Sequence, residues 1–197
     1  MATFLIVLAL LVAMALYFIG IFNQLVKLKN RYQNAFAQID VQLKRRYDLI
    51  PNLIAVAKQA MQHERETLTE VIAARNQAHA ILDKAARQPG DADIMRSLQN
   101  AETQLQSALG SFNLLVEAYP DLKTNQTMLE LNEELSSTEN RIAFARQAFN
   151  DAVMFYNQYR QSFPPVLVAA SFGHPVDAAL LEFVDKAQIE QVPQVHF

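Results

Sequence analysis

Residues 4–22 read FLIVLALLVAMALYFIGIF, an uninterrupted apolar run that decides the architecture of this chain. As a helix, these residues would be about 29 Å long, close to the ~30 Å hydrocarbon thickness of a bilayer. No second run of this kind follows, so we predict one membrane-spanning helix within residues 1–26. The side chains that we expect to lie within the bilayer include Phe4, Leu5, Ala9, Ala13, Tyr17, Gly20 and Phe22.

The apolar run could instead be a secretory signal peptide or a buried core helix. A signal peptide carries a basic amino-terminal region and a small-residue cleavage site after a shorter apolar core. Met1-Ala2-Thr3 contains no base, and the run continues past its Ala-x-Ala sequence, Ala13-Met14-Ala15. We therefore predict an anchor that is retained.

The charges that flank the run predict its orientation. Lys27, Lys29 and Arg31 follow the apolar segment, whereas only the α-amino group precedes it. Basic residues are enriched on the cytoplasmic side of membranes, so we predict an outer N-terminus and a cytoplasmic remainder. Each of the three bases would also gain ~1 kcal/mol against an anionic leaflet, which makes membrane lipid an expected partner.

Composition narrows the fold class of the rest of the chain. The 197 residues include four glycines, no tryptophan and no cysteine, which leaves little room for a turn-rich β-fold. The formal net charge is −3, and four acids against Lys186 after residue 173 already account for it. The preceding part is therefore nearly neutral, and nucleic acid is not an expected partner.

Helical periodicity is the dominant pattern beyond the anchor. It divides into four stretches, at residues 25–47, 49–87, 94–119 and 125–161. Short links between long amphipathic helices favour antiparallel neighbours. We therefore predict an all-α fold, in which the membrane helix continues into an up-down bundle over residues 27–173.

Prolines mark the breaks between these stretches. Pro51 predicts either a kink or a new helix, for which Asp48 would be the N-cap. Pro89-Gly90 and Pro120 separate the later stretches, and Pro164 follows the last. Residues 174–197 form a third region, an acidic tail in which we predict a short amphipathic helix at 178–188 and an extended end.

The sequence lacks the residue patterns of common catalytic, metal-binding and phosphate-binding sites. No glutamate stands three residues before a histidine, as a di-metal carboxylate bundle requires, and His63-Glu64 lacks the second histidine of a zinc protease helix. There is no glycine-rich phosphate loop and no thiol. We therefore predict no catalytic residue, no metal site and no cofactor; a bundle-type metal protein or enzyme is the remote alternative.

Two groups of polar residues call for an explanation. Lys44, Arg45 and Arg46 lie about 26 Å beyond Lys27 at helical rise, too far to feel the bilayer through a Debye length of ~8 Å. They form either a solvated or interhelically paired cluster or a patch that docks a partner. The second group comprises Asp48, Asn140, Arg141, Arg146, Asn150, Asp151, Tyr156 and Asn157. Interhelical hydrogen bonds that fix the register of the helices are its simplest role, and a ligand groove is the alternative.

Six motifs, in order along the chain, resemble the LemA family. They are VQLKRRYDLIPNL (41–53), YPDLK (119–123), TENRIAFAR (138–146), FNDAV (149–153), YN (156–157) and SFP (162–164). The resemblance extends from the anchor to about Phe172 and is weak after His174. It implies a membrane-anchored antiparallel helical bundle with an outer N-terminus, in a family whose biochemical function is unsettled. Typical members carry Ala or Val where this chain has Tyr47.

These observations predict a non-enzymatic scaffold or assembly protein of a bacterial cytoplasmic membrane, acting on an unknown protein client. The alternative is an adaptor or regulator of a membrane enzyme that binds through Lys44–Arg46. We also expect a homo-oligomer, because small residues recur on one stripe of the anchor and close helix approach requires small residues. That stripe is Ala9, Ala13, Leu16 and Gly20, and it continues in phase into Leu28, Tyr32, Ala35 and Ile39.

Overall fold

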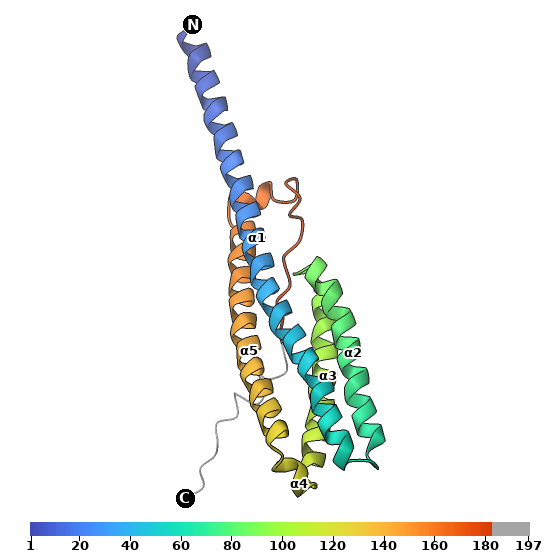
Figure 1. Ribbon diagram of the computed structural model, residues 1–197. Helices are drawn as coiled ribbons and strands as arrows, with labels where there is room; N and C mark the ends of the chain where they lie inside the picture. Colours follow the sequence, from blue (N-terminus) through green and yellow to red (C-terminus); the bar gives the residue numbers. More distant parts are fainter. Residues whose placement is uncertain (183–197) are drawn as a thin grey trace, which may run out of the picture.

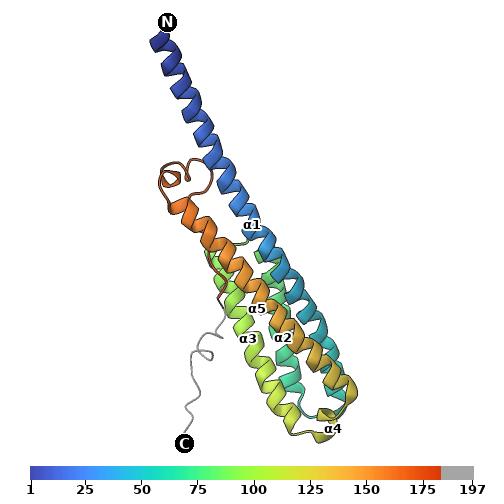
Figure 2. The ribbon, with the colours of Figure 1, turned by 90° about the vertical axis from the view of Figure 1, so that its left-hand side faces the viewer.

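The computed structural model describes residues 1–182, which contain helices and no strand (Figure 1). The helices are α1 (Ala2–Ala60), α2 (Arg65–Arg87), α3 (Ala92–Glu117), α4 (Pro120–Lys123) and α5 (Gln126–Gln161), followed by the 3-10 turn η1 (Pro165–Leu167). Successive long helices run in opposite directions (Figures 1 and 2). The predicted all-α, up-down bundle is confirmed.

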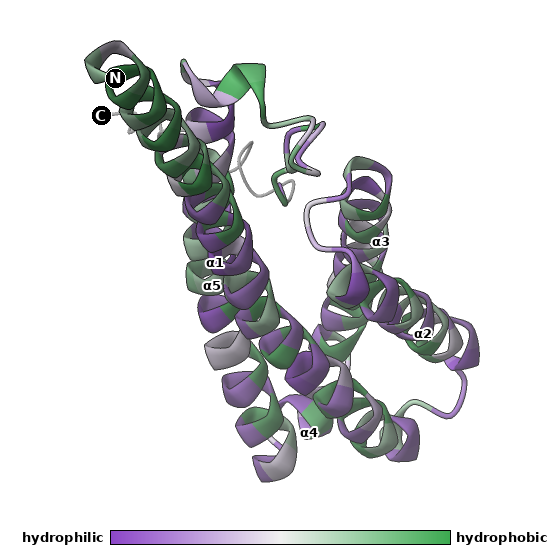
Figure 3. Cartoon of the chain, turned by 90° about the horizontal axis from the view of Figure 1, so that it is seen from above, coloured by the Kyte–Doolittle hydropathy of each residue, from purple (hydrophilic) through white to green (hydrophobic). Residues whose placement is uncertain are grey.

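Helix α1 is far longer than its partners. Its 59 residues span about 88 Å at 1.5 Å per residue. The first turns project beyond the bundle with their apolar side chains exposed, and burial begins at Ile21. Seen from above, the projecting turns are apolar on every side, whereas the rest of α1 carries both apolar and polar residues (Figure 3). The projecting part is long and apolar enough to span a membrane, as the sequence predicts.

The bundle is built from two helix pairs, α1 with α5 and α2 with α3, which diverge toward the end from which the apolar segment of α1 projects (Figures 1 and 3). The apolar faces of these helices pack into one core. Its largest fully buried side chains include Phe36, Tyr47, Phe112 and Phe149. Tyr32 joins α1 to α5 through edge-to-face ring contacts with Phe149 and Tyr156.

Pro51 does not begin a new helix. Helix α1 continues through it to Ala60, and Asp48 is an exposed residue inside the helix rather than an N-cap. Leu49, Ile50 and Leu53, on both sides of the proline, are buried in the core. The chain reverses at residues 61–64 instead, so the predicted single stretch 49–87 belongs to two helices.

The predicted helix at 178–188 is wrong over the part that the structure describes. Residues 178–182 have no regular secondary structure, and 183–188, like the rest of the tail, lie outside the described residues. Upstream, residues 165–173 form η1 and further turns that end at Gly173, which has a φ of +83°.

The part of the predicted oligomer stripe that lies beyond the apolar run is also not free. Leu28, Tyr32 and Ile39 are buried inside the bundle, because α5 covers α1 almost to the apolar run. Within the stripe, Ala9, Ala13 and Gly20 remain exposed.

Candidate binding groove

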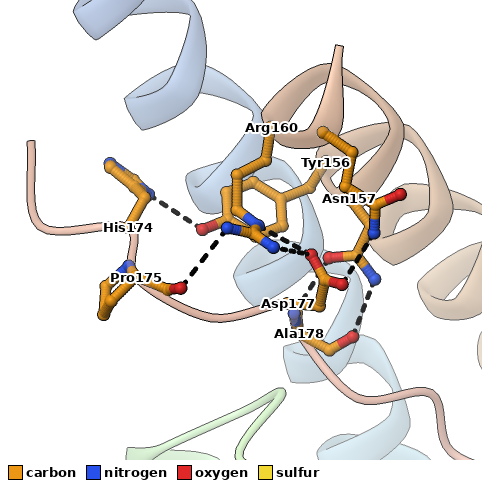
Figure 4. Close-up of polar contacts among 8 residues, drawn as sticks. Tyr156, Asn157, Arg160, His174, Pro175, Asp177 and Ala178 are labelled. Atoms are coloured by element: carbon orange, nitrogen blue, oxygen red, sulfur yellow. Dashed lines mark hydrogen bonds and ion pairs between the residues drawn. The ribbon is translucent and has the colours of Figure 1, made fainter. Parts of the chain in front are cut away.

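Residues 174–182 cross the space between the two helix pairs as an extended strap. The strap follows the turns after α5 and passes between α5 and the α2–α3 connection (Figure 1). It is held mainly by polar side chains from the last three turns of α5 (Figure 4). Asn150, further back along α5, also bonds to it. We call the space that the strap occupies the groove.

Two asparagines of α5 bind the backbone of the strap. Asn157 donates from Nδ2 to the Ala178 carbonyl and accepts from the Ala178 N–H, both at 2.9 Å. Asn150 does the same for Leu181, at 3.0 and 2.9 Å. Each carboxamide therefore satisfies both backbone groups of one residue.

The spacing of these contacts explains why the strap is extended. Asn150 and Asn157 are two helical turns apart, about 10.5 Å. Ala178 and Leu181 span about 10 Å when extended at ~3.3 Å per residue, but only about 4.5 Å in a helix. The asparagine spacing of α5 thus selects an extended strap that runs antiparallel to the helix.

A carboxylate fixes the register of the strap. Asp177 accepts hydrogen bonds from Arg160 and Gln161, each at 2.6 Å, at the end of α5. Arg160 also donates to the Pro175 carbonyl at 3.4 Å. The groove therefore recognises one acidic side chain next to a backbone that the asparagines hold.

The strap begins at a buried histidine. His174 Nδ1 lies 2.9 Å from the Tyr156 hydroxyl, and the imidazole is 4% exposed. Burial lowers the pKa of His174, and the charges of Lys29 and Arg160 lower it further. The neutral imidazole is therefore the form that the groove favours.

The α2–α3 connection closes the other side of the groove. Ala179 donates its N–H to the Gly90 carbonyl at 2.7 Å. Gly90 has a φ of +88°, and a Cβ there would lie 3.0 Å from the Cβ of Ala178 and 3.3 Å from the Tyr32 ring. Glycine thus provides both the turn and the close approach of the strap. A cavity of about 350 Å³ remains beside the strap, with Lys29 and Arg87 in its wall.

The predicted polar residues divide into two groups. Asn150, Tyr156 and Asn157 come together on the strap, so they bond to an extended segment of the same chain and not to another helix. Asn140, Arg141 and Asp151 are exposed, and Arg146 is half-buried. The sequence analysis missed Arg160, His174 and Asp177, because the strap lacks the periodicity that would have placed it against α5.

The basic cluster Lys44–Arg46 is paired within the chain. Lys44 contacts Asp40 at 2.9 Å and Asp83 at 3.7 Å, and Arg45 contacts Glu134 at 2.7 Å. These bases therefore join α1 to α2 and α5 rather than forming an unpaired surface patch.

Arg46 lies in the core with a carboxylate that sequence reasoning overlooked. Its guanidinium binds the buried Glu102 of α3 and, at 2.9 Å, Glu139 of α5, and Tyr47 donates its hydroxyl to Glu102. Burial, together with the charge of Glu102, raises the pKa of Tyr47. Tyr47, at the position where the sequence analysis noted Ala or Val as typical, therefore supplies a hydrogen-bond donor to the buried Glu102 carboxylate.

The juxtamembrane bases lie where the sequence places them, just below the apolar run. Lys27 and Arg31 are exposed, and Arg31 stacks over the Phe155 ring at 5.3 Å. Lys29 is half-buried and turns toward the strap. Within residues 1–182, no three His, Asp or Glu side chains are grouped as metal ligands would be.

Comparison with known proteins confirms the family resemblance that the six sequence motifs indicate. Residues 35–197 match the LemA family. A relative from Metamycoplasma hominis, described as Protein LemA, is 26% identical over 140 residues, which cover 71% of this chain. The matched region spans 59% of the relative's length.

Proposed function

Since this chain belongs to the LemA family, we propose that it is a non-enzymatic, membrane-anchored scaffold that positions a helical bundle at the cytoplasmic face of a bacterial cytoplasmic membrane. In this proposal residues 1–26 are the anchor, 27–173 the bundle, and 174–197 the tail. The single helix α1 carries the proposal, because it joins the exposed apolar segment to the bundle core without a break. The part of α1 beyond Phe22 is about 57 Å long, so it would hold the far end of the bundle well away from the lipid.

Cysteine labelling tests the orientation. The chain contains no cysteine, so His63→Cys in the exposed α1–α2 turn and Ala2→Cys at the N-terminus give single reporters. In intact spheroplasts, a membrane-impermeant maleimide should label Ala2→Cys but not His63→Cys, and permeabilisation should expose the latter. The reverse pattern would overturn the cytoplasmic location of the bundle.

Self-association is part of the scaffold proposal, and the exposed half of the small-residue stripe supports it. The pair Ala9→Leu and Ala13→Leu should reduce the size of the protein in mild detergent, measured by light scattering. Ala15→Leu is the matched control, because position 15 lies about 160° around the helix from Ala13. A wild-type protein that is monomeric at membrane-like concentrations would rule out self-association.

A second candidate is an adaptor of a membrane enzyme, and the groove favours it. Its asparagines bind backbone groups, so they would accept an extended segment of another protein in place of the strap. Purification from native membranes, followed by identification of cross-linked partners, separates the two functions. A scaffold yields mainly self-cross-links, whereas an adaptor yields one stoichiometric client that is lost on substitution of Asn150 and Asn157 by Ala.

A further inference from the structure

The turn after α5 exposes apolar side chains although it belongs to the folded bundle. Phe163 is 78% exposed, Leu167 71% and Val166 48%. The surrounding sequence, residues 161–176, contains no Asp, Glu, Lys or Arg. A stretch of this kind is unusual on a surface that faces water.

This turn lies beside the apolar segment of α1. Phe163, Pro164 and Pro165 line a recess together with Leu16 and Gly20 of α1. A few residues on, the Phe172 ring packs edge-to-face on Phe22, with centroids 5.5 Å apart. Leu16 is six residues above Phe22, or about 9 Å into the span that the sequence predicts.

Most backbone N–H groups of the turn need no partner from outside it. Pro164 and Pro165 have no N–H to satisfy. The next four residues, Val166 to Ala169, all donate their N–H groups to carbonyls within residues 162–165, at 2.9–3.1 Å. A non-helical segment in contact with lipid would need such hydrogen bonds between its own N–H and carbonyl groups, because hydrocarbon offers no hydrogen-bond partners.

We propose that residues 163–167 form a second membrane contact, inserted into the facing leaflet beside α1. The partner is the boundary between the headgroups and the acyl chains. Phe163, Val166 and Leu167 enter the hydrocarbon. The inference rests on the proposed membrane anchoring and adds a contact that the anchor alone does not supply.

Two membrane contacts restrict the orientation of the bundle more than a single contact does. A lone spanning helix can rotate about its axis, whereas a helix with an inserted turn on one side presents a fixed face of the bundle to the lipid. The strap begins at His174, directly after the turn and the Phe22–Phe172 contact. The insertion therefore places the membrane-proximal end of the groove next to the headgroups.

Tryptophan fluorescence tests the insertion, since the chain has no tryptophan of its own. The full-length variant Leu167→Trp is reconstituted in phosphatidylcholine vesicles with acyl chains brominated near the headgroup or near the bilayer centre. We expect blue-shifted emission, and stronger quenching by the shallow bromines than by the deep ones. Phe163→Trp is the second reporter, used alongside it in case either substitution disturbs folding, which circular dichroism monitors.

Two control variants separate the possible failures. Val12→Trp reports on the anchor and should be quenched most by the deep bromines. Phe144→Trp, at a 74% exposed position on α5, should escape quenching. Quenching of Val12→Trp without quenching of the two turn reporters would overturn the insertion and leave the anchor intact. Absence of quenching at Val12 would overturn the proposed anchor, and the insertion with it.

Discussion

Arg75 of α2 donates from Nε to the backbone carbonyl of Tyr47 in α1, across 2.9 Å. Tyr47 is four residues before Pro51, whose missing N–H would otherwise be the helical donor to that carbonyl. Arg75 also lies 3.5 Å from the carboxylate of Asp48. A side chain from the neighbouring helix thus replaces the hydrogen bond that proline removes, and α1 continues without a break.

Loss of this donor should destabilise the protein. We expect Arg75→Met to lower the free energy of unfolding by about 1–2 kcal/mol, because the Tyr47 carbonyl is left without a partner. In a Pro51→Ala background the same change should cost clearly less, since alanine, unlike proline, provides the helical N–H. Thermal unfolding of the four proteins in mild detergent measures this coupling.

Arg87→Met is the control for this double-mutant cycle, since it removes an exposed arginine from the same helix. It should change stability by less than about 0.5 kcal/mol. Equal costs of Arg75→Met with and without Pro51 would show that the arginine does not compensate for the proline.

Arg75 also shows why the sequence misplaced one helix boundary. Periodicity located the buried faces correctly, because burial along a helix follows local spacing. It gives no sign that Arg75, 28 residues after Tyr47, supplies the hydrogen bond that Pro51 removes. The actual reversal at residues 61–64 contains neither glycine nor proline, so no local signal marked it.

The buried pair of Arg46 and Glu102 yields a second prediction. Glu102→Gln should destabilise the protein by about 3–5 kcal/mol, because it leaves the guanidinium without its buried countercharge. A combined Arg46→Met, Tyr47→Phe and Glu102→Leu variant should recover most of this loss, since it removes every buried polar group of the cluster together and leaves only the exposed Glu139. Thermal unfolding measures both; a triple variant as unstable as Glu102→Gln would argue against an electrostatic origin.

A signal for this pair was present in the sequence. Glu102 stands four residues after Leu98 and three before Leu105, so it occupies a seam position of α3. A carboxylate at such a position needs a buried cation. The identity of that cation depends on how the helices meet, which periodicity does not reveal.

The asparagines of the groove yield a third prediction. Asn157→Ala should release the strap locally, because Ala178 loses the partners of both its backbone groups. Digestion with a protease that cleaves after glutamate should then become faster at Glu182. Asn140→Ala, at an exposed position of the same helix, should leave the rate unchanged. Equal rates for wild type and Asn157→Ala would show that the carboxamide does not hold the strap.

The sequence could indicate only one side of the contacts in the groove, the side chains of α5. Asn150 and Asn157 stood out as polar residues near an apolar seam, seven residues apart. Their partners are backbone groups of Ala178 and Leu181, which any residue type except proline would offer. Side-chain patterns therefore reveal the helix side of this interface and not the strap.

His174 makes the docking of the strap dependent on pH. Its pKa is lowered in the folded protein by burial and by the nearby charges of Lys29 and Arg160, whereas the released strap has the ordinary value of 6.5. The released form therefore takes up a proton first as the pH falls. Stability from this group is complete above about pH 7.5 and decreases as the pH falls through 6.5 toward the lower folded value.

The thermal unfolding midpoint of the wild type should therefore decrease more steeply between about pH 7.5 and pH 5.5 than that of His174→Asn. Asparagine retains a hydrogen-bond acceptor for Tyr156 but does not titrate. His79→Asn, which removes a partly exposed histidine from α2, should follow the wild-type profile. Parallel profiles for wild type and His174→Asn, or a wild type that gains relative stability in acid, would refute a neutral, buried His174 as the determinant of docking.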